Sequence, residues 1–218
     1  VVNPDMIQKI VLWAVPVLFA ITVHEVAHGW VAYRFGDKTA FMLGRLTLNP
    51  FKHIDLIGTI LVPLILLILP TGFIFGWAKP VPINPRNFKH YRRDMALVAL
   101  AGPVSNFIMA IIWAIISKIA IWLQMAHQID TGPIVYMGQA GIFINLMLGL
   151  LNLFPLPPLD GGRVLSNILP GKASYYFDRL EPFGLLIILI LLATGLLGDI
   201  LGHLIYLSSN LIAALFGF

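Results

Sequence analysis

The most regular feature of the sequence is a succession of long apolar runs separated by short polar connections. A helix of about 20 apolar residues crosses the hydrocarbon core of a bilayer, whereas a run near 14 fits either a short span or a re-entrant hairpin. The pattern predicts an all-α membrane protein, a polytopic transmembrane helix bundle of about five or six membrane segments. The apolar runs cover approximately residues 6–35, 56–69, 95–123, 134–154, 183–197 and 200–218.

Composition strengthens this prediction. Hydrophobic residues make up 59% of the 218 residues and charged residues only 11%, and the mean hydropathy is +0.89. A soluble domain is about 45–50% apolar and about 25% charged. The bilayer must therefore cover much of the apolar surface, and the length leaves room for one membrane domain over residues 1–218. The chain has no cysteine, so a transition metal would take nitrogen and oxygen ligands.

The basic residues predict the topology. Twelve of the 14 Lys and Arg residues lie in the connections after the first run, before the third run and after the fourth run, and none lies in 124–133. Cytoplasmic connections carry an excess of Lys and Arg, so 124–133 is predicted to lie outside. No basic face interleaved with aromatic residues accompanies the net charge of +4, and we therefore expect no nucleic-acid partner.

The region between the first and third runs predicts a re-entrant, partly extended hairpin. Arg34 and Arg93 are both expected in the cytoplasm, so the chain between them must enter the membrane and return. Residues 56–69 would enter and residues 73–83 would return. The returning segment is rich in aromatic residues, Gly and Pro, which favour extended backbone. Non-helical backbone at membrane depth needs protein or a water-filled cavity beside it.

Candidate chemistry lies in the first run, at His24-Glu25-Val26-Ala27-His28. On a helix, residues four apart share one face, so the two imidazoles could hold one Zn²⁺ with the glutamate beside a bound water. Ionisable groups inside a membrane are costly and therefore functional by default. The alternative interpretation is that the histidines only form hydrogen bonds between helices.

The best candidate for a third ligand is Asp160. A catalytic zinc has three protein ligands and an open fourth position. Prolines at 155, 157 and 158 should end the fourth helix, and Asp160-Gly161-Gly162 is predicted to form a turn, although Asp160 could instead only cap the next helix. His24–His28 precedes Arg34 by six to ten residues, roughly 9–15 Å along a helix, and Asp160 should reach the same cytoplasmic leaflet.

Several motifs together resemble one family, the site-2 protease family of intramembrane zinc metalloproteases. The resemblance covers about residues 22–163 in the expected order. The sequence departs from the family in lacking room for the PDZ or CBS domain that some members carry, so we expect a compact member. The motifs are His24–His28, Gly44-Arg45 with Asn49-Pro50, residues 76–82, Gly102-Pro103-Val104-Ser105-Asn106, and the stretch from Asn152 to Gly161.

The resemblance implies a zinc metalloendopeptidase that cleaves transmembrane segments of membrane-protein substrates. His24, His28 and Asp160 would bind one catalytic Zn²⁺, and Glu25 would take the proton of the attacking water. Asn106 and Asn152 are candidates to hold the substrate backbone or the oxyanion, the alternative being hydrogen bonds between helices. The extended segment 73–83 could receive the unwound substrate by strand addition.

The predicted organisation is a single integral membrane protease domain, with a catalytic core at about 6–163 and membrane segments at 183–218. We expect a multi-pass protein of a prokaryotic cell membrane, embedded in the lipid bilayer, with its active site toward the cytoplasmic leaflet. The alternative function is a non-proteolytic membrane metal-binding protein or a metal-ion transporter; a transporter more often shows inverted repeats, which this sequence lacks.

His53 could be a spare ligand or an ordinary interfacial histidine, and Asp94 is expected to cap the third run.

Overall fold

The computed structural model describes residues 4–68 and 76–217, and every regular element in these ranges is a helix. The all-α prediction is confirmed. The long helices are α1 (Pro4–Arg34), α4 (Tyr91–His127), α5 (Gly132–Asn152) and α9 (Leu196–Phe216). The shorter elements are α2 (Thr39–Met42), η1 (Pro50–Lys52), the π-helical η2 (Leu56–Leu61), α3 (Val62–Ile68), η3 (Pro85–Asn87), α6 (Asp160–Ile168), α7 (Gly171–Asp178) and α8 (Glu181–Ala193).

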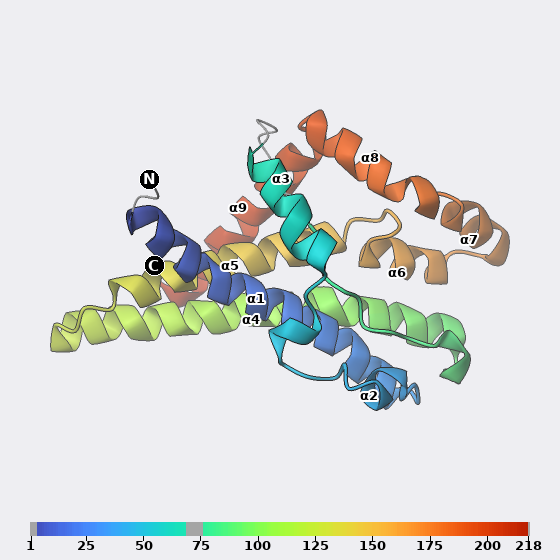
Figure 1. Cartoon of the computed structure of the whole chain (residues 1–218), viewed down its shortest axis with the longest axis horizontal. Coiled ribbons are helices and arrows are strands. Elements are labelled where there is room, and N and C mark those ends of the chain that lie inside the picture. The colour runs from blue at the N-terminus through green and yellow to red at the C-terminus, as the bar shows by residue number, and fades with distance from the viewer. Residues whose placement is uncertain (1–3, 69–75, 218) are drawn as a thin grey trace.

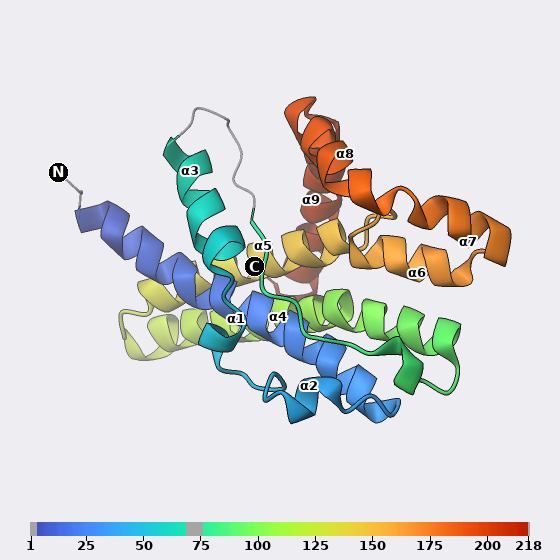
Figure 2. The same ribbon diagram turned by 45° about the vertical axis from the view of Figure 1, so that its right-hand side comes forward.

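The centre of the bundle is formed by α1, α4 and α5. All three are long and apolar enough to cross a membrane, α1 from Val11 onward. The helices α4 and α5 run side by side, joined by the short connection predicted to lie outside, and α1 crosses them obliquely (Figures 1 and 2). Every apolar run that was long enough to predict a span in this region therefore forms a single helix.

The C-terminal apolar region divides differently from the prediction. The break lies at Gly195, whose φ of +80° disfavours residues with a side chain, rather than at 197–200. As a result α8 has only 13 residues, roughly 20 Å of helix, whereas the 21 residues of α9 suffice to cross a membrane. The sequence left open whether 200–218 spans, and α9 is long and apolar enough to do so.

The direction of α9 follows from its contacts. Near its start, Leu197 and Leu201 pack with Leu156, just after α5 ends. Near its end, Ile212 packs with Ala110 and Ala114 of α4. The helix α9 therefore begins beside the end of α5 and crosses the bundle to reach the second half of α4 (Figure 2).

The Asp-Gly-Gly segment starts a helix instead of forming the predicted turn. The chain turns earlier, at residues 153–159, and Asp160 is the first residue of α6. A side chain at Gly161 would collide with the Leu153 carbonyl, and one at Gly162 with the backbone at Leu156 and Pro157. The two glycines therefore let α6 fold back tightly against the turn, which directs Asp160 toward the bundle.

The predicted hairpin enters through η2 and α3 and returns through residues 76–84, which contain no helix. Leu69 and residues 73–75 of the predicted hairpin lie outside the described residues. Trp77 donates its backbone N–H to Gly58 O at 3.1 Å, and Lys79 donates to His53 O at 2.9 Å. Bonds from every second residue toward the protein are typical of extended chain, so the prediction of a non-helical return is confirmed for the described part.

Candidate metal centre

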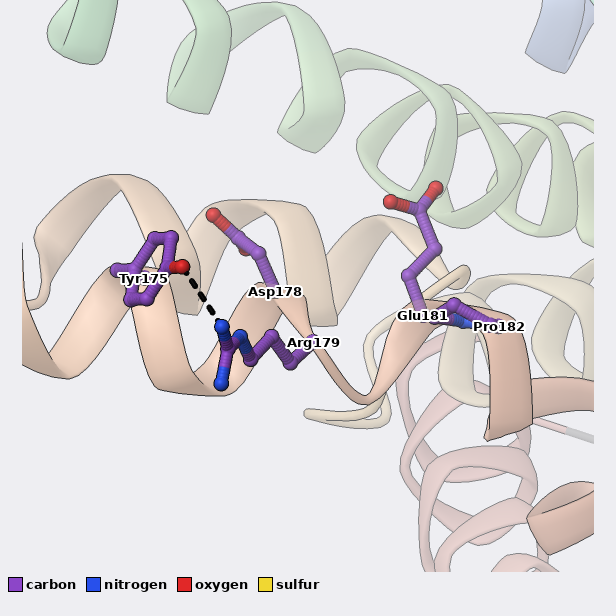
Figure 3. A pocket seen from close by; sticks show the side chains of 5 residues that line it. All are labelled: Tyr175, Asp178, Arg179, Glu181 and Pro182. Atoms are coloured by element: carbon purple, nitrogen blue, oxygen red, sulfur yellow. Dashed lines mark hydrogen bonds between the residues drawn. The ribbon is translucent and has the colours of Figure 1, made fainter.

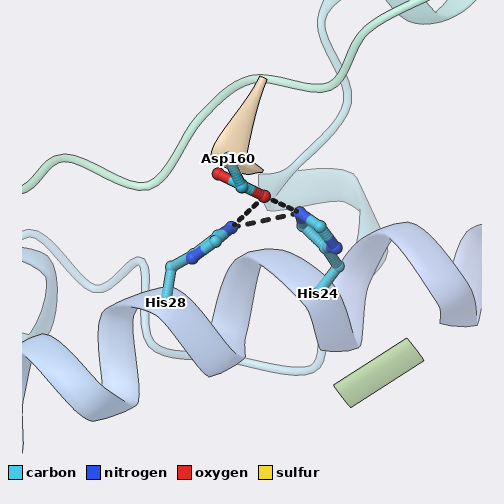
Figure 4. Close-up of side chains that lie close together, drawn as sticks. All are labelled: His24, His28 and Asp160. Atoms are coloured by element: carbon cyan, nitrogen blue, oxygen red, sulfur yellow. Dashed lines mark hydrogen bonds and ion pairs between the residues drawn. The ribbon is translucent and has the colours of Figure 1, made fainter. Parts of the chain in front are cut away.

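Three predicted ligands from two distant parts of the chain meet at one point. His24 and His28 point from one face of α1 toward Asp160, which hangs from the start of α6 (Figure 4). Asp160 Oδ2 lies 3.1 Å from His24 Nε2 and 3.2 Å from His28 Nε2, and the two Nε2 atoms are 3.0 Å apart. Within the described residues this is the one group of three such side chains close enough to share a metal ion.

Hydrogen bonds on the far side of each imidazole fix its tautomer. His28 Nδ1 lies 2.7 Å from the Val98 carbonyl oxygen, which can only accept, so Nδ1 carries the proton. His24 Nδ1 lies 2.6 Å from Asn106 Oδ1. The Asn106 amide nitrogen donates to Ala20 O at 3.2 Å, which identifies the atom facing His24 as the oxygen. Both histidines therefore turn an Nε2 lone pair toward Asp160.

This arrangement fits a zinc ion. Three acceptor atoms converge in a site where His24, His28 and Asp160 are only 7–8% exposed, and Asp160 Oδ2 has no hydrogen-bond donor. Converging lone pairs in a buried site repel one another unless a cation lies between them. Zinc bonds of about 2.0–2.1 Å in tetrahedral geometry separate neighbouring ligand atoms by roughly 3.3 Å, close to the observed spacing. The nitrogen and oxygen donors also suit zinc.

Gly102 of α4 lies directly against the imidazoles. A Cβ at this position would lie 2.6 Å from His24 Nε2 and would also collide with His28 Nε2. Glycine is the one residue type without a Cβ. Gly102 therefore allows α4 to pack directly against the two imidazoles and to form one wall of the metal centre. The wall also supplies Val98 and Asn106, the two residues that orient the histidines.

Glu25 connects the centre to the extended segment. Its Oε2 accepts the backbone N–H of Val81 at 2.8 Å. Because Glu25 is the neighbour of His24 along α1, this bond places residues 76–84 beside the His-Glu-x-x-His helix. Lys79 O also accepts a hydrogen bond from the Arg45 side chain at 2.9 Å. The carboxylate is thus fixed at the edge of the metal centre, next to an extended peptide.

Asp37 anchors the far end of the same segment. Its carboxylate accepts the backbone N–H of Asn84 and the side-chain N–H of Asn87, both at 2.7 Å, and bonds from Thr39 as well. Burial alone would raise the pKa of Asp37, but these hydrogen bonds outweigh it and lower the pKa below the usual range. A charged Asp37 therefore holds the chain that leads out of the extended segment against the end of α1.

The structure places the remaining candidates as follows. Asn106 is fully buried, with its amide bonded to His24, Ala20 and Asn145. Asn152, half-buried, donates to Leu148 O one turn earlier in α5 at 2.9 Å. Direct contact of either amide with substrate stays a prediction.

Two polar residues outside the metal group have structural roles. His53 is 1% exposed and donates from Nε2 to Thr47 O at 2.9 Å, so this bond holds the chain at Thr47 in place. Asp94 lies in the first turn of α4 and accepts the backbone N–H of the N-cap residue His90 at 3.0 Å, so it stabilises the start of this helix without being the N-cap residue itself.

Sequence reasoning missed Asn145 of α5, which is fully buried and bonded to Asn106 at 3.0 Å. Its signal is an amide in the middle of an apolar run, because an amide in a membrane needs a partner.

A surface hollow of about 470 Å³ lies elsewhere, where α7 meets α8 (Figure 3). Tyr175, Asp178, Arg179, Glu181 and Pro182 line it, and none of these is a predicted site residue.

The chain is similar to known zinc metalloproteases. The model of peptidase family M50 matches residues 118–194. The protein named "Putative zinc metalloprotease YwhC" from Bacillus subtilis is 42% identical over 184 residues, covering 84% of this chain and 80% of that protein. "Putative zinc metalloprotease Rip2" from Mycolicibacterium smegmatis is 29% identical over 190 residues, or 87% and 69% of the two chains.

An archaeal relative, "Zinc metalloprotease MJ0392" from Methanocaldococcus jannaschii, is 27% identical over 178 residues, which cover 80% of this chain and 40% of that protein. No solved structure matches. The length and identity of the match to YwhC establish the family. The chain belongs to peptidase family M50, the site-2 protease family, and is a membrane zinc metalloprotease.

Proposed function

We propose that this membrane zinc metalloprotease cleaves peptide bonds within transmembrane segments of membrane-protein substrates. The observation that carries the proposal is the 2.8 Å hydrogen bond from Val81 N–H to Glu25 Oε2. It joins an extended peptide segment to the glutamate of the His-Glu-x-x-His motif. A protease that acts inside the bilayer needs both parts together, because a helical substrate must become extended before its carbonyls are accessible.

The proposed zinc ligands are His24, His28 and Asp160. Zinc bound there supplies a Lewis acid that lowers the pKa of a water in the open position and polarises the scissile carbonyl. The Nδ1 bonds to Asn106 Oδ1 and Val98 O keep both imidazoles in the neutral tautomer that can bind a metal. The whole of residues 1–218 would act as one protease domain, with α9 packed on the side of α4 and α5.

Glu25 is the proposed general base. It would take a proton from the attacking water and deliver it to the leaving nitrogen, a role typically worth 10²–10⁴-fold in rate. The bond from Val81 uses one carboxylate oxygen and leaves the other for the water. The same bond sets the carboxylate at a fixed position relative to any peptide that lies along residues 76–84.

The extended segment offers one edge to substrate. Trp77, Lys79 and Val81 direct their N–H groups toward the protein, so Ala78, which lies between two of them, faces the opposite edge. In the described part of the chain, Ala78 has no hydrogen-bond partner for its N–H or its carbonyl. Pro80 and Pro82 follow it and lack N–H groups. A substrate strand added at this edge would therefore pair with Ala78 in both directions.

The proposed location is a prokaryotic cell membrane, with the site toward the cytoplasmic leaflet. The metal-binding turn of α1 lies six to ten residues before Arg34, and Asp160 follows the end of α5. Both ends lead into the basic connections that are expected in the cytoplasm. Water would reach the metal over this short distance, roughly 9–15 Å along the helix.

The test compares the wild-type protein with Glu25→Gln, using single-span membrane-protein substrates in detergent or liposomes. Glutamine can still accept the Val81 N–H, so the fold and the zinc content should persist while cleavage is lost. Asp160→Ala should reduce zinc content. If wild-type protein binds zinc and cleaves none of the substrates, the proteolytic function proposed here is wrong, and zinc flux into liposomes then distinguishes a transporter from a binding protein.

A further inference from the structure

We propose that Asn145 of α5, acting through Asn106 of α4, sets the position of the proton on His24 and thereby keeps this histidine competent to bind zinc. The pair is a positioning device: neither amide touches the metal. The proposal rests on the proposed function only in taking His24 as a zinc ligand.

The bonds run in one direction from a backbone carbonyl to the metal centre. Asn145 Nδ2 lies 2.8 Å from Gly141 O, which can only accept. Asn145 therefore turns its Oδ1 to Asn106, whose Nδ2 donates to it at 3.0 Å. Asn106 Oδ1 in turn faces His24 Nδ1 at 2.6 Å. Each group determines the orientation of the next, so the Gly141 carbonyl, acting through Asn145 and together with Ala20 O, fixes the His24 proton on Nδ1.

The orientation matters because an amide can rotate by 180°. A reversed Asn106 would present its NH₂ group to His24, and the proton of the imidazole would then move to Nε2, where it would block metal binding. Reversal would also set the Asn106 oxygen against Asn145 Oδ1 and Ala20 O. Both asparagines are 0% exposed, so no water relieves this repulsion, and a buried unsatisfied polar group costs about 1–3 kcal/mol.

His28 shows the contrast. Its Nδ1 donates directly to the Val98 carbonyl at 2.7 Å, and a backbone carbonyl cannot be reversed. His24 has no backbone acceptor in this position and depends on a side chain that needs its own support. This difference explains why a second buried amide, 39 residues away from Asn106 in sequence, stands behind one histidine and not the other.

The following variants distinguish loss of the hydrogen bonds from Asn145 through Asn106 to His24, here called the relay, from a general loss of packing. Asn106→Leu removes the acceptor for His24 and should lower zinc affinity by roughly 10–100-fold, the usual effect of losing the outer partner of a metal ligand. Asn106→Asp keeps the acceptor that faces His24 but sets its second oxygen against Asn145 Oδ1 and Ala20 O, so it should restore only part of the affinity. Asn145→Leu should have a smaller effect, because Ala20 O still holds Asn106. Ser105→Ala, which removes a buried bond to Gly102 O beside the relay, is the matched control and should bind zinc normally.

Two measurements test whether Asn106 sets the tautomer of His24 and thereby supports zinc binding. Competition with a chelator gives zinc affinity, and ¹⁵N NMR of histidine-labelled, metal-free protein reports which ring nitrogen carries the proton. We expect Asn106→Leu to change the His24 signals while His28 keeps its Nδ1 proton. An unchanged His24 tautomer would overturn the proposal, as would equal changes at both histidines. If His24→Ala leaves zinc affinity intact in the wild-type background, His24 is not a ligand, and it is the proposed metal site that fails.

Discussion

Gly102→Ala tests the geometry of the metal centre with a single methyl group. An alanine Cβ would lie 2.6 Å from His24 Nε2, whereas ordinary contacts begin near 3.4 Å, so the imidazole must retreat by about 0.8 Å. It cannot retreat freely, because its Nδ1 is bonded to Asn106 at 2.6 Å. His28, also in collision, is held by Val98 in the same way.

The expected loss of zinc affinity follows from how little zinc–ligand distances can vary. Zinc ligands stay within about 0.2 Å of their preferred distances, so a shift of about 0.8 Å removes at least one ligand. We expect zinc affinity to fall by at least about 100-fold, the upper end of what loss of an outer hydrogen-bond partner costs. Overpacking should destabilise the fold by only about 1–3 kcal/mol, and alanine recovers about 1 kcal/mol of helix propensity.

The assay is chelator competition for zinc, alongside thermal unfolding in detergent to show that the variant is folded. Gly202→Ala is the control, because a Cβ at this helical glycine of α9 has nothing within 4 Å, and it should bind zinc as the wild type does. A folded Gly102→Ala protein with unchanged zinc affinity would show that α4 does not lie against His24 and His28, and the described metal centre would be wrong.

Three further outcomes are expected. Asp160→Ala should leave a two-histidine site and lower zinc affinity in the same competition assay; unchanged zinc content would remove Asp160 from the centre. Ala78→Pro should slow cleavage of a single-span substrate without changing zinc affinity, because it removes the N–H donor at the free edge of the extended segment; equal cleavage would exclude pairing there. Asp37→Asn should destabilise the protein by about 1–3 kcal/mol at neutral pH. The depressed pKa of Asp37 makes its contribution complete above the unfolded value of about 3.9. The difference between variant and wild type should therefore shrink as the pH falls below about 4, measured by thermal unfolding, and a difference that is constant with pH would refute this account of Asp37.

The predictions that succeeded rest on local chemistry. Apolar runs became α1, α4 and α5 because a bilayer-spanning chain must satisfy its backbone hydrogen bonds within helices. The position of His24 and His28 on one face needed only the helical period. The return of the hairpin as extended chain followed from its content of Gly and Pro, and the structure confirms it over residues 76–84.

The predictions that failed depended on neighbours. Asp160-Gly161-Gly162 has the composition of a turn, yet it begins α6, because the turn at 153–159 leaves room for a helix only where side chains are absent. The division between α8 and α9 moved to Gly195 because a positive φ interrupts the helix there, and hydropathy does not register backbone conformation.

The sequence by itself determined that the chain is a membrane protein and that His24 and His28 share one face of one helix, since both follow from composition and from contacts within one or two turns. It predicted, from the same local patterns, which residues would bear the chemistry. Only the tertiary structure decided that Asp160 Oδ2 reaches the two imidazoles, that Val81 holds Glu25, and that Asn106 faces His24 from within the bundle. These contacts join residues 56–136 positions apart, and their geometry is set by how closely α1, α4, α5 and α6 pack, which no local pattern in the sequence encodes.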